Sequence, residues 1–321
     1  CIFNCNRSYG GAEMKEIRVL TARTMKLYLK NPLSILFSFV YMLLFIVLIS
    51  LFLGDYMAKG MMDVYAEVEG MDFAHIRWLV DTTSMAGVLM INCILVPLNV
   101  LTIMVQDSND NRLDSFLVSA VARNKLVVGY WLAPFLVGIV MNILCLFLSE
   151  GFIVMNGGEW LSMRSNLEMA GLIIANTFSA TSILFVAAML TKSVSLYSTF
   201  TGIMSALVGF LTGAFLPIGM FPANIQKIFA LVPAHHGATL MRRVMTREPL
   251  MATFGNVTDQ TVKGTYMTAK EIIDIYASEN GITYMFGNVQ FPFSAMLIIV
   301  IGSGLLFMAF SIIWMEHYKK H

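Results

Sequence analysis

The side chains in this sequence with the chemistry to bind a metal or attack a substrate are few, and their spacing fits no catalytic site. His235 and His236 are adjacent and precede Gly237, whereas zinc-binding histidines on a helix stand one turn apart, as in H-E-x-x-H. The four cysteines form no C-x-x-C pair, and Cys93 and Cys145 lie in apolar runs, where cysteine is a small packing residue. We therefore expect no catalytic residue, no metal site and no cofactor bound by this chain.

The sequence also lacks the groups that drive a transport cycle. It has no G-x-x-x-x-G-K-[ST] loop, whose backbone amides cradle the phosphates of ATP. Glu150 and Glu168 lie at the ends of apolar segments, whereas an ion-coupled carrier keeps a carboxylate at mid-depth. The 25 methionines are scattered, which favours flexible packing against lipid or greasy substrates over a copper pathway. Any energy source is therefore expected outside this chain.

Composition places the chain in a membrane. Of its 321 residues, 57% are hydrophobic and 13% are charged, whereas a soluble domain carries roughly 25% charged residues. So few charges do not cover a water-facing surface, and the remaining apolar surface needs lipid. The net charge of +1 argues against nucleic acid as a partner, because binding phosphates takes a concentrated basic face.

Six apolar segments are long enough to cross the bilayer, since about 20 helical residues span its hydrocarbon core. They must be helices, because each backbone N–H and C=O at that depth needs a partner within the protein. The sequence thus predicts an all-α integral membrane protein with a single transmembrane domain over residues 14–321. The expected spans are residues 33–53, 85–105, 126–148, 170–190, 194–216 and 293–315.

The positions of lysine and arginine predict the orientation of these spans. Basic residues gather before the first span, between the second and third, between the fourth and fifth, and after the sixth, where Lys319 and Lys320 stand. Such loops face the cytoplasm. The short loops on the opposite side are mostly acidic. We therefore expect a multi-pass protein with both termini in the cytoplasm.

Two segments precede the first span. Residues 1–13 are polar and irregular, so we expect a disordered tail before Met14, which is a candidate start, and no signal peptide opens the sequence. Residues 14–31 have an apolar and a basic face, a pattern typical of a helix in the cytoplasmic headgroup layer. The alternative is a plain extension of the first span.

The stretch between the fifth and sixth spans is first apolar and cut by prolines, then polar. Apolar runs of about 10–14 residues more often re-enter the membrane than cross it, so residues 217–250 predict a re-entrant helical pair on the outer side. The polar remainder, residues 251–290, contains a capping box from Thr268 to Glu271 that begins a helix, and Gly281 ends it.

The cytoplasmic loop between the second and third spans predicts a short amphipathic helix. Its apolar residues recur at the helical spacing i, i+3, i+4, i+7, and charges surround them. The apolar stripe is Leu113, Phe116, Leu117 and Ala120, and the charges are Arg112, Asp114 and Arg123. Such a stripe docks onto another protein or lies on the bilayer, and the spacing alone does not choose between these.

Two stretches resemble the membrane subunits of ABC-2-type exporters, a class that includes daunorubicin-type drug permeases and polysaccharide exporters. Residues 112–129, RLDSFLVSAVARNKLVVG, are similar to the coupling segment of that family, although Ala120 replaces its usual proline and Arg112 a small residue. Residues 213–236, GAFLPIGMFPANIQKIFALVPAHH, resemble the re-entrant element after the fifth span, and Arg242 follows them. The resemblance covers nearly the whole chain from Met14 onward.

The resemblance implies a role for specific residues. It implies that the chain pairs with a sister permease, as a homodimer or a heterodimer, and sits on a separate ATPase subunit that binds ATP and Mg²⁺. Coupling to that ATPase would involve Arg112, Leu113, Asp114, Phe116, Leu117 and Arg123. The re-entrant gate would involve Gly213, Phe215, Pro217, Pro222, Pro233, His235 and Arg242.

The expected function is therefore export of an amphiphilic drug, antibiotic or lipid-like substrate across a bacterial cell membrane, by a subunit that is not itself an enzyme. A polysaccharide or lipid-linked glycan exporter is the alternative within the same family. A stand-alone secondary transporter or channel is the main rival outside it, followed by a membrane-embedded enzyme or assembly factor.

Overall fold

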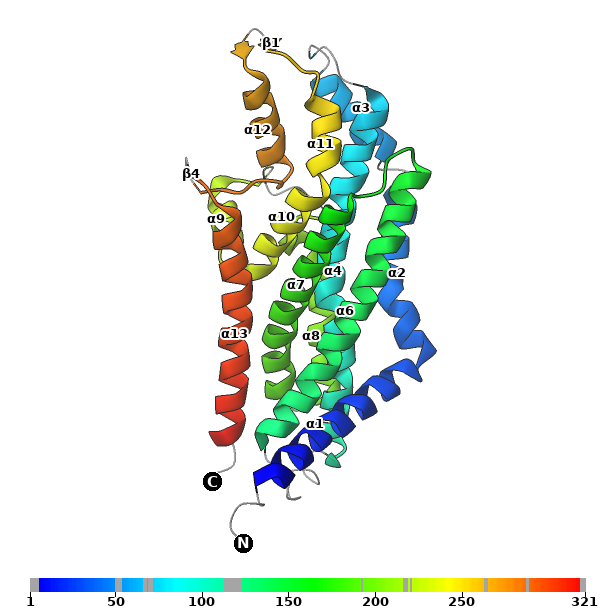
Figure 1. Cartoon of the computed structure of the whole chain (residues 1–321), viewed down its shortest axis with the longest axis vertical. Helices are drawn as coiled ribbons and strands as arrows, with labels where there is room; N and C mark the ends of the chain where they lie inside the picture. Colours follow the sequence, from blue (N-terminus) through cyan, green and yellow to red (C-terminus); the bar gives the residue numbers. More distant parts are fainter. Residues whose placement is uncertain are drawn as a thin grey trace.

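The computed structural model describes residues 6–49, 54–65, 68, 72–112, 123–191, 193–215, 219, 221–262, 265–286 and 289–317. Five of its helices are long and apolar enough to cross a membrane. They are α4 (Phe73–Asn109), α6 (Arg123–Met155), α7 (Met163–Leu190), α8 (Val194–Leu211) and α13 (Phe293–His317). Together they form an upright bundle (Figure 1), which confirms the predicted all-α membrane fold.

The remaining predicted span corresponds to α2 (Pro32–Leu48), which meets α1 (Asn6–Leu29) at a bend of 83°. Asn31 caps α2 by accepting a hydrogen bond from the Ser34 N–H, and Pro32 occupies the first helical turn, where proline needs no N–H partner. α1 lies obliquely across the lower ends of the bundle helices (Figure 1). The prediction of a disordered tail over residues 1–13 is wrong from Asn6 onward, because α1 already begins there.

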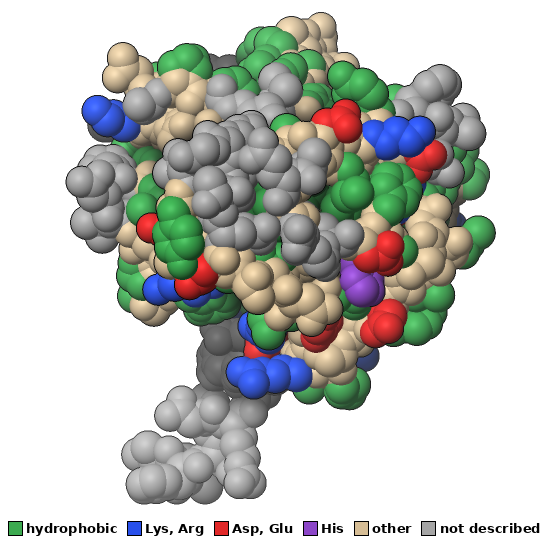
Figure 2. Space-filling view, turned by 90° about the horizontal axis from the view of Figure 1, so that it is seen from above, with side chains coloured by type: hydrophobic (Ala, Val, Ile, Leu, Met, Phe, Trp, Pro, Cys, Tyr) green, Lys and Arg blue, Asp and Glu red, His purple; other side chains and the backbone are tan. Residues whose placement is uncertain are grey.

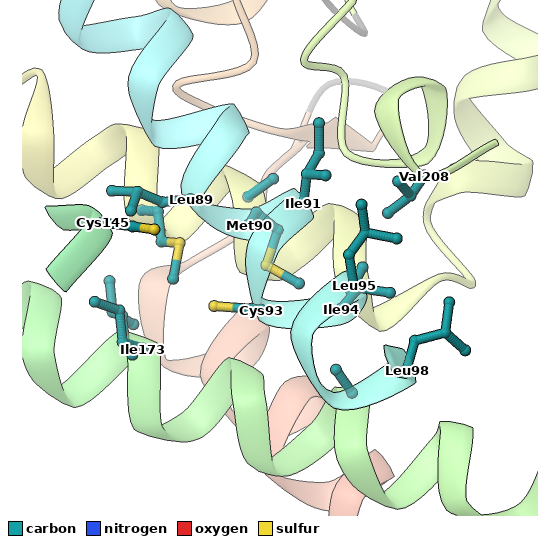
Figure 3. Packing of buried hydrophobic residues seen from close by; sticks show 14 of the residues in the cluster. Leu89, Met90, Ile91, Cys93, Ile94, Leu95, Leu98, Cys145, Ile173 and Val208 are labelled. Carbon is teal, nitrogen blue, oxygen red and sulfur yellow. The ribbon is translucent and has the colours of Figure 1, made fainter. Parts of the chain in front are cut away.

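The central helix is α4, and its most apolar window is 83% buried. It is hydrophobic around its whole circumference, as a helix surrounded by others must be. Figure 3 shows Leu89 and Cys93 of α4 on the side of Cys145 of α6 and Ile173 of α7, and Leu95 on the side of Val208 of α8. These positions agree with Cys93 and Cys145 being packing residues, because both are fully buried and neither forms a disulfide.

The predicted fifth span, residues 194–216, is shorter than expected. α8 ends at Leu211, Thr212 follows as its C-cap, and Gly213 adopts a φ of +65°. Only glycine enters that left-handed region without strain, so the chain leaves the helix there.

A pair of short helices follows, as predicted. α9 (Ala223–Phe229) and α10 (Pro233–Met245) lie beside the upper part of α13 rather than beyond its end (Figure 1). Pro222 is the residue before α9, and Pro233 begins α10. α10 packs against α4, α7 and α13, so its backbone is enclosed by protein, as a re-entrant segment requires.

The upper end of the bundle carries a small additional layer (Figure 1). It comprises α3 (Gly54–Val64), α11 (Arg247–Phe254), α12 (Ala269–Glu279) and two antiparallel hairpins, β1–β2 (Gln260–Val262 with Thr265–Met267) and β3–β4 (Met285–Phe286 with Val289–Gln290). Its core joins residues such as Met61, Leu79, Phe254 and Tyr276. Seen from this end, the surface mixes acidic, basic and apolar side chains (Figure 2), as a water-facing surface does.

The capping box and the glycine stop predicted for α12 are both confirmed. Thr268 accepts a hydrogen bond from the Glu271 N–H, and the Glu271 carboxylate accepts one from the Thr268 N–H at 2.8 Å. That backbone hydrogen bond, helped by the Thr268 hydroxyl, lowers the pKa of Glu271. Gly281, with a φ of +68°, turns the chain after the helix.

Close packing of α1 on α6 depends on Gly129. A Cβ placed there would lie 2.7 Å from the Cδ2 of Leu20, and the Thr21 hydroxyl donates to the Gly129 carbonyl at 3.2 Å. We expect Gly129→Val to push α1 away and to lower the free energy of unfolding by about 1–3 kcal/mol, measured by thermal unfolding in detergent. Gly151→Val on the same helix is the control, because a Cβ there meets nothing within 4 Å; equal losses in both variants would contradict this packing role.

Candidate coupling and gate sites

The described residues on either side of the predicted coupling segment lie at the lower end of the bundle, where α4 ends and α6 begins. Arg112 follows the end of α4 and Arg123 begins α6. Leu113, Asp114, Phe116 and Leu117 lie outside the described residues. What the structure does describe is how the two ends of the segment are held.

A buried carboxylate holds the end of α4, and we call it the Asp107 joint. Asp107 is 2% exposed and accepts two hydrogen bonds from the Arg23 guanidinium, at 2.6 and 2.9 Å. The Tyr130 hydroxyl donates to the same carboxylate at 2.9 Å, and Arg112 Nη1 lies 3.6 Å from it. A bidentate, charge-assisted pair is directional as well as strong. The joint therefore ties α1, α4 and α6 together at the entrance to the coupling segment.

A second ion pair supports the same contact on the other side of the segment. Lys125, in the first turn of α6, lies 3.1 Å from the Glu16 carboxylate of α1. Both ends of the coupling segment are thus attached to α1. Part of α1 faces protein in this way, whereas the sequence suggested a helix turned toward lipid headgroups.

Sequence reasoning did not single out Asp107, Arg23 or Tyr130. Arg23 counted only as one of several basic residues before the first span, and Asp107 as part of a polar loop. One sign was available: Asp107 follows Met104 by three residues, and Met104 lies on the buried face of α4. A carboxylate on a buried face needs a cation.

Toward the upper end of the bundle, the structure brings together Gly213, Phe215 and Arg242 from the predicted gate. The Phe215 ring stacks on Phe45 of α2, with ring centroids 6.1 Å apart, and meets Phe210 edge-on at 5.3 Å. The side chain is 44% exposed. Pro217 lies outside the described residues.

Arg242 reaches from α10 to the end of α8. Its side chain is fully enclosed, and Nη2 donates to the carbonyls of Thr212 and Gly213 at 2.9 and 2.7 Å. These carbonyls have no partner further along the helix, and the C-terminal end of a helix attracts a cation. Arg242 therefore holds the turn that carries Phe215.

His235 belongs to a different part of the gate region. It is 1% exposed, and its ring meets Tyr284 edge-on at 4.8 Å. His236 shares a hydrogen bond of 2.8 Å with the Ala230 carbonyl. Within the described ranges no three His, Cys, Asp or Glu side chains gather as metal ligands. His235 thus packs α10 against the residue that precedes the β3–β4 hairpin, and His236 links α10 to the end of α9.

A groove of about 700 Å³ runs beside α8. Only 17% of the most apolar window of α8 is buried, so this helix is open along most of its length. The groove combines hydroxyls with small and apolar side chains. It is lined by Thr102, Val194, Tyr197, Ser198, Thr201, Gly202, Ser205, Ala206 and Phe215.

The membrane-length helices, the helix lying across their lower ends and the enclosed helical pair define a multi-pass membrane protein of the transporter class. The sequence model of the ABC-2 type transporter family matches residues 15–246, from α1 to the residue that ends α10. This chain belongs to that family, whose members are the transmembrane permease components of ABC transporters and are not themselves catalytic. No curated protein matches the chain.

The Asp107 joint predicts that two nearby carboxylates, those of Asp107 and Asp110, contribute unequally to the free energy of unfolding. Asp107→Asn removes the charge that pairs with Arg23, and we expect it to lower the free energy of unfolding by about 1–3 kcal/mol. Asp110→Asn is the matched control, because Asp110 is 47% exposed and pairs only loosely with Arg112, at 3.4 Å; a surface pair contributes about 0.5 kcal/mol or less. Chemical denaturation in detergent measures the free energy of unfolding of both variants. Equal losses in the two variants would contradict a stabilising role for the Asp107 joint.

Proposed function

We propose that this chain is the permease of an ATP-driven exporter, and that it moves an amphiphilic drug, antibiotic or lipid-like substrate out of the cell with energy from a separate ATPase subunit. That ATPase would bind ATP and Mg²⁺ and would contact residues 112–123 from the cytoplasm. The observation that supports the proposal most directly is the Asp107 joint, which links both the lower bundle and α1 to the start of this segment.

The proposed cycle begins with closure of the ATPase subunits around ATP, which pushes on the coupling segment. A push that enters at Arg112 reaches Asp107 directly, and from there Arg23 of α1 and Tyr130 of α6. Because a bidentate ion pair resists rotation, these three helices would shift as one body rather than bend separately.

The substrate path in this proposal is the groove beside α8, closed on its open side by a second permease, identical or homologous. Hydroxyls of Ser198, Thr201 and Ser205 serve the polar part of an amphiphile, and the apolar lining serves the rest. Phe215 stands at the upper end of the groove, where its contacts with Phe45 and Phe210 close the path.

Association with an ATPase is the first test. A tagged chain purified from its native membrane should bring with it a P-loop ATPase, and the reconstituted pair should move fluorescent amphiphiles into inside-out vesicles only when ATP is present. A native protein that never associates with a nucleotide-binding subunit is not the permease of such an exporter.

The coupling stripe gives a sharper test. We expect Phe116→Asp to abolish stimulation of the ATPase by the permease while the protein stays folded, because a charge is costly in a packed apolar contact. Ser115→Asp is the matched control, since residue 115 faces away from the predicted stripe. Normal transport by Phe116→Asp would remove the docking role from this segment.

The proposed path predicts that a bulky side chain on the groove side of α8 reduces transport more than the same side chain on another side of the helix. Ser205→Trp fills the groove, so we expect it to reduce ATP-dependent transport at least tenfold while the protein remains assembled with the ATPase. Ile203→Trp adds the same bulk at a position that is 54% exposed and outside the groove lining, and should leave transport within about twofold. Transport rates in vesicles, normalised to protein content, compare the two; equal effects would place the path elsewhere.

A further inference from the structure

The capping role of Arg242 uses only one of its two terminal nitrogens. Nη2 makes both hydrogen bonds to the carbonyls that end α8. Nη1 is buried and has no hydrogen-bond partner. An unpaired N–H of a buried cation is costly, and the α8 turn does not satisfy it.

The positive charge of Arg242 is also left without a counter-charge. No ion pair joins it to a carboxylate anywhere in the described part of the chain. Buried cations in proteins are normally paired. The C-terminal end of α8 offsets only about half a charge.

The end of α12 also lies beside Nη1, and three of its carbonyls already accept other hydrogen bonds. A Cβ on Gly281 would lie 3.2 Å from Nη1, so this turn passes directly beside the guanidinium. The Tyr276 carbonyl accepts from Asn280, that of Ala277 accepts from the N–H groups of Ile282 and Thr283, and that of Ser278 accepts from Gly281. The end of α12 therefore approaches Nη1 without bonding to it.

Arg242 borders a cavity of about 40 Å³ at the gate. One water-sized occupant needs about 10–15 Å³, so this volume admits one small ion or the head of a larger molecule. Its lining mixes the aromatic gate residues with polar groups. It includes Phe45, Phe215, Thr83, Ser84, Tyr276 and Asn280.

We propose that this cavity, which we call the Arg242 cavity, is a subsite for a small monovalent anion. Its occupant is either a free halide or the carboxylate head of a transported amphiphile. The guanidinium provides the charge and the free N–H, the Ser84 hydroxyl and the Asn280 amide in the lining can donate further hydrogen bonds, and the aromatic rings exclude water. Only the carboxylate source rests on the proposed export function; halide binding does not depend on it.

In this arrangement the occupant acts on the gate. Arg242 holds the turn of Thr212 and Gly213 through Nη2, and Phe215 follows that turn. An anion at Nη1 fixes the guanidinium from its other side. The outer gate is therefore expected to be more stable when the cavity is filled.

Thermal unfolding of the purified wild-type permease in an uncharged detergent tests the halide source. Sodium gluconate is replaced by sodium chloride at constant ionic strength. Chloride should raise the Tm saturably, by about 2–4 °C. Arg242→Gln keeps an amide donor without the charge and should lose this rise. Arg243→Gln, on the same helix, should keep it.

The carboxylate source is tested by the same unfolding measurement without added salt, by comparing dodecanoate with its uncharged methyl ester. Stabilisation by dodecanoate alone, lost in Arg242→Gln, assigns the cavity to a substrate head group. Chloride stabilisation with the same loss assigns it to a free ion. If neither anion stabilises the wild type, or if both effects persist in Arg242→Gln, the subsite does not exist.

Should Arg242→Gln fail to fold, the wild-type titrations still decide whether an anion binds. Arg242→Lys then replaces it, because lysine keeps the charge but loses the second nitrogen. We expect the chloride concentration that gives half of the Tm increase to be at least tenfold higher in that variant. An unchanged concentration would overturn the assignment to Nη1. None of these measurements requires transport, so failure of the anion site and failure of the export function are separable.

Discussion

A polar backbone group in the hydrocarbon core must find its partner within the protein, and the interruption after α8 is where this constraint acts most strongly. With 18 residues, α8 is shorter than the roughly 20 that a crossing helix needs. The carbonyls near the end of α8 accept backbone N–H groups of the turn itself, but the carbonyls of Thr212 and Gly213 in that turn would face an apolar environment without another donor. Arg242, brought in by the re-entrant α10, supplies the missing donors. The broken helices are stable because the second half of the interruption caps the first.

α4 connects this turn to the lower end of the bundle, where α1 lies (Figure 1). Its 37 residues extend roughly 55 Å, and polar contacts anchor it at both ends. At the lower end Asp107 binds Arg23 of α1. At the upper end Arg77 pairs with Asp81 at 3.0 Å and with Asp55 of α3. α4 is also the most enclosed of the five membrane-length helices. A displacement of one end of the bundle is therefore best transmitted to the other end through α4.

The sequence was sufficient for features whose cause is local. Apolar length predicted the spans, the spacing of Thr268 and Glu271 predicted the start of α12, and prolines predicted that the stretch after α8 is divided into short helices. Each depends on residues within a few positions of one another. The end of α8 was misplaced because apolar residues continue beyond Gly213, and hydropathy does not register a left-handed turn.

Features that depend on packing could not be predicted in this way. The partners Arg23 and Asp107 are 84 positions apart, and only the crossing of α1 over α4 brings them together. Likewise, the sequence pointed to Arg242 by resemblance, but the direction of each nitrogen follows from where α8 and α12 end around it. Residue types gave the candidates, and tertiary contacts gave them their roles.

The two least enclosed helices show how the same chain presents different faces to different surroundings. α13 has only 22% of its most apolar window buried, and its open side carries Ile298, Leu306 and Ile313. Hydrocarbon satisfies such a face completely. α8 is similarly open, yet Ser198, Thr201 and Ser205 line the groove beside it. Lipid tails offer hydroxyl groups no hydrogen-bond partner, so in lipid these hydroxyls could bond only to the backbone of their own helix. The exposed side of α13 is therefore explained by lipid alone, whereas that of α8 calls for a polar path or a second protein.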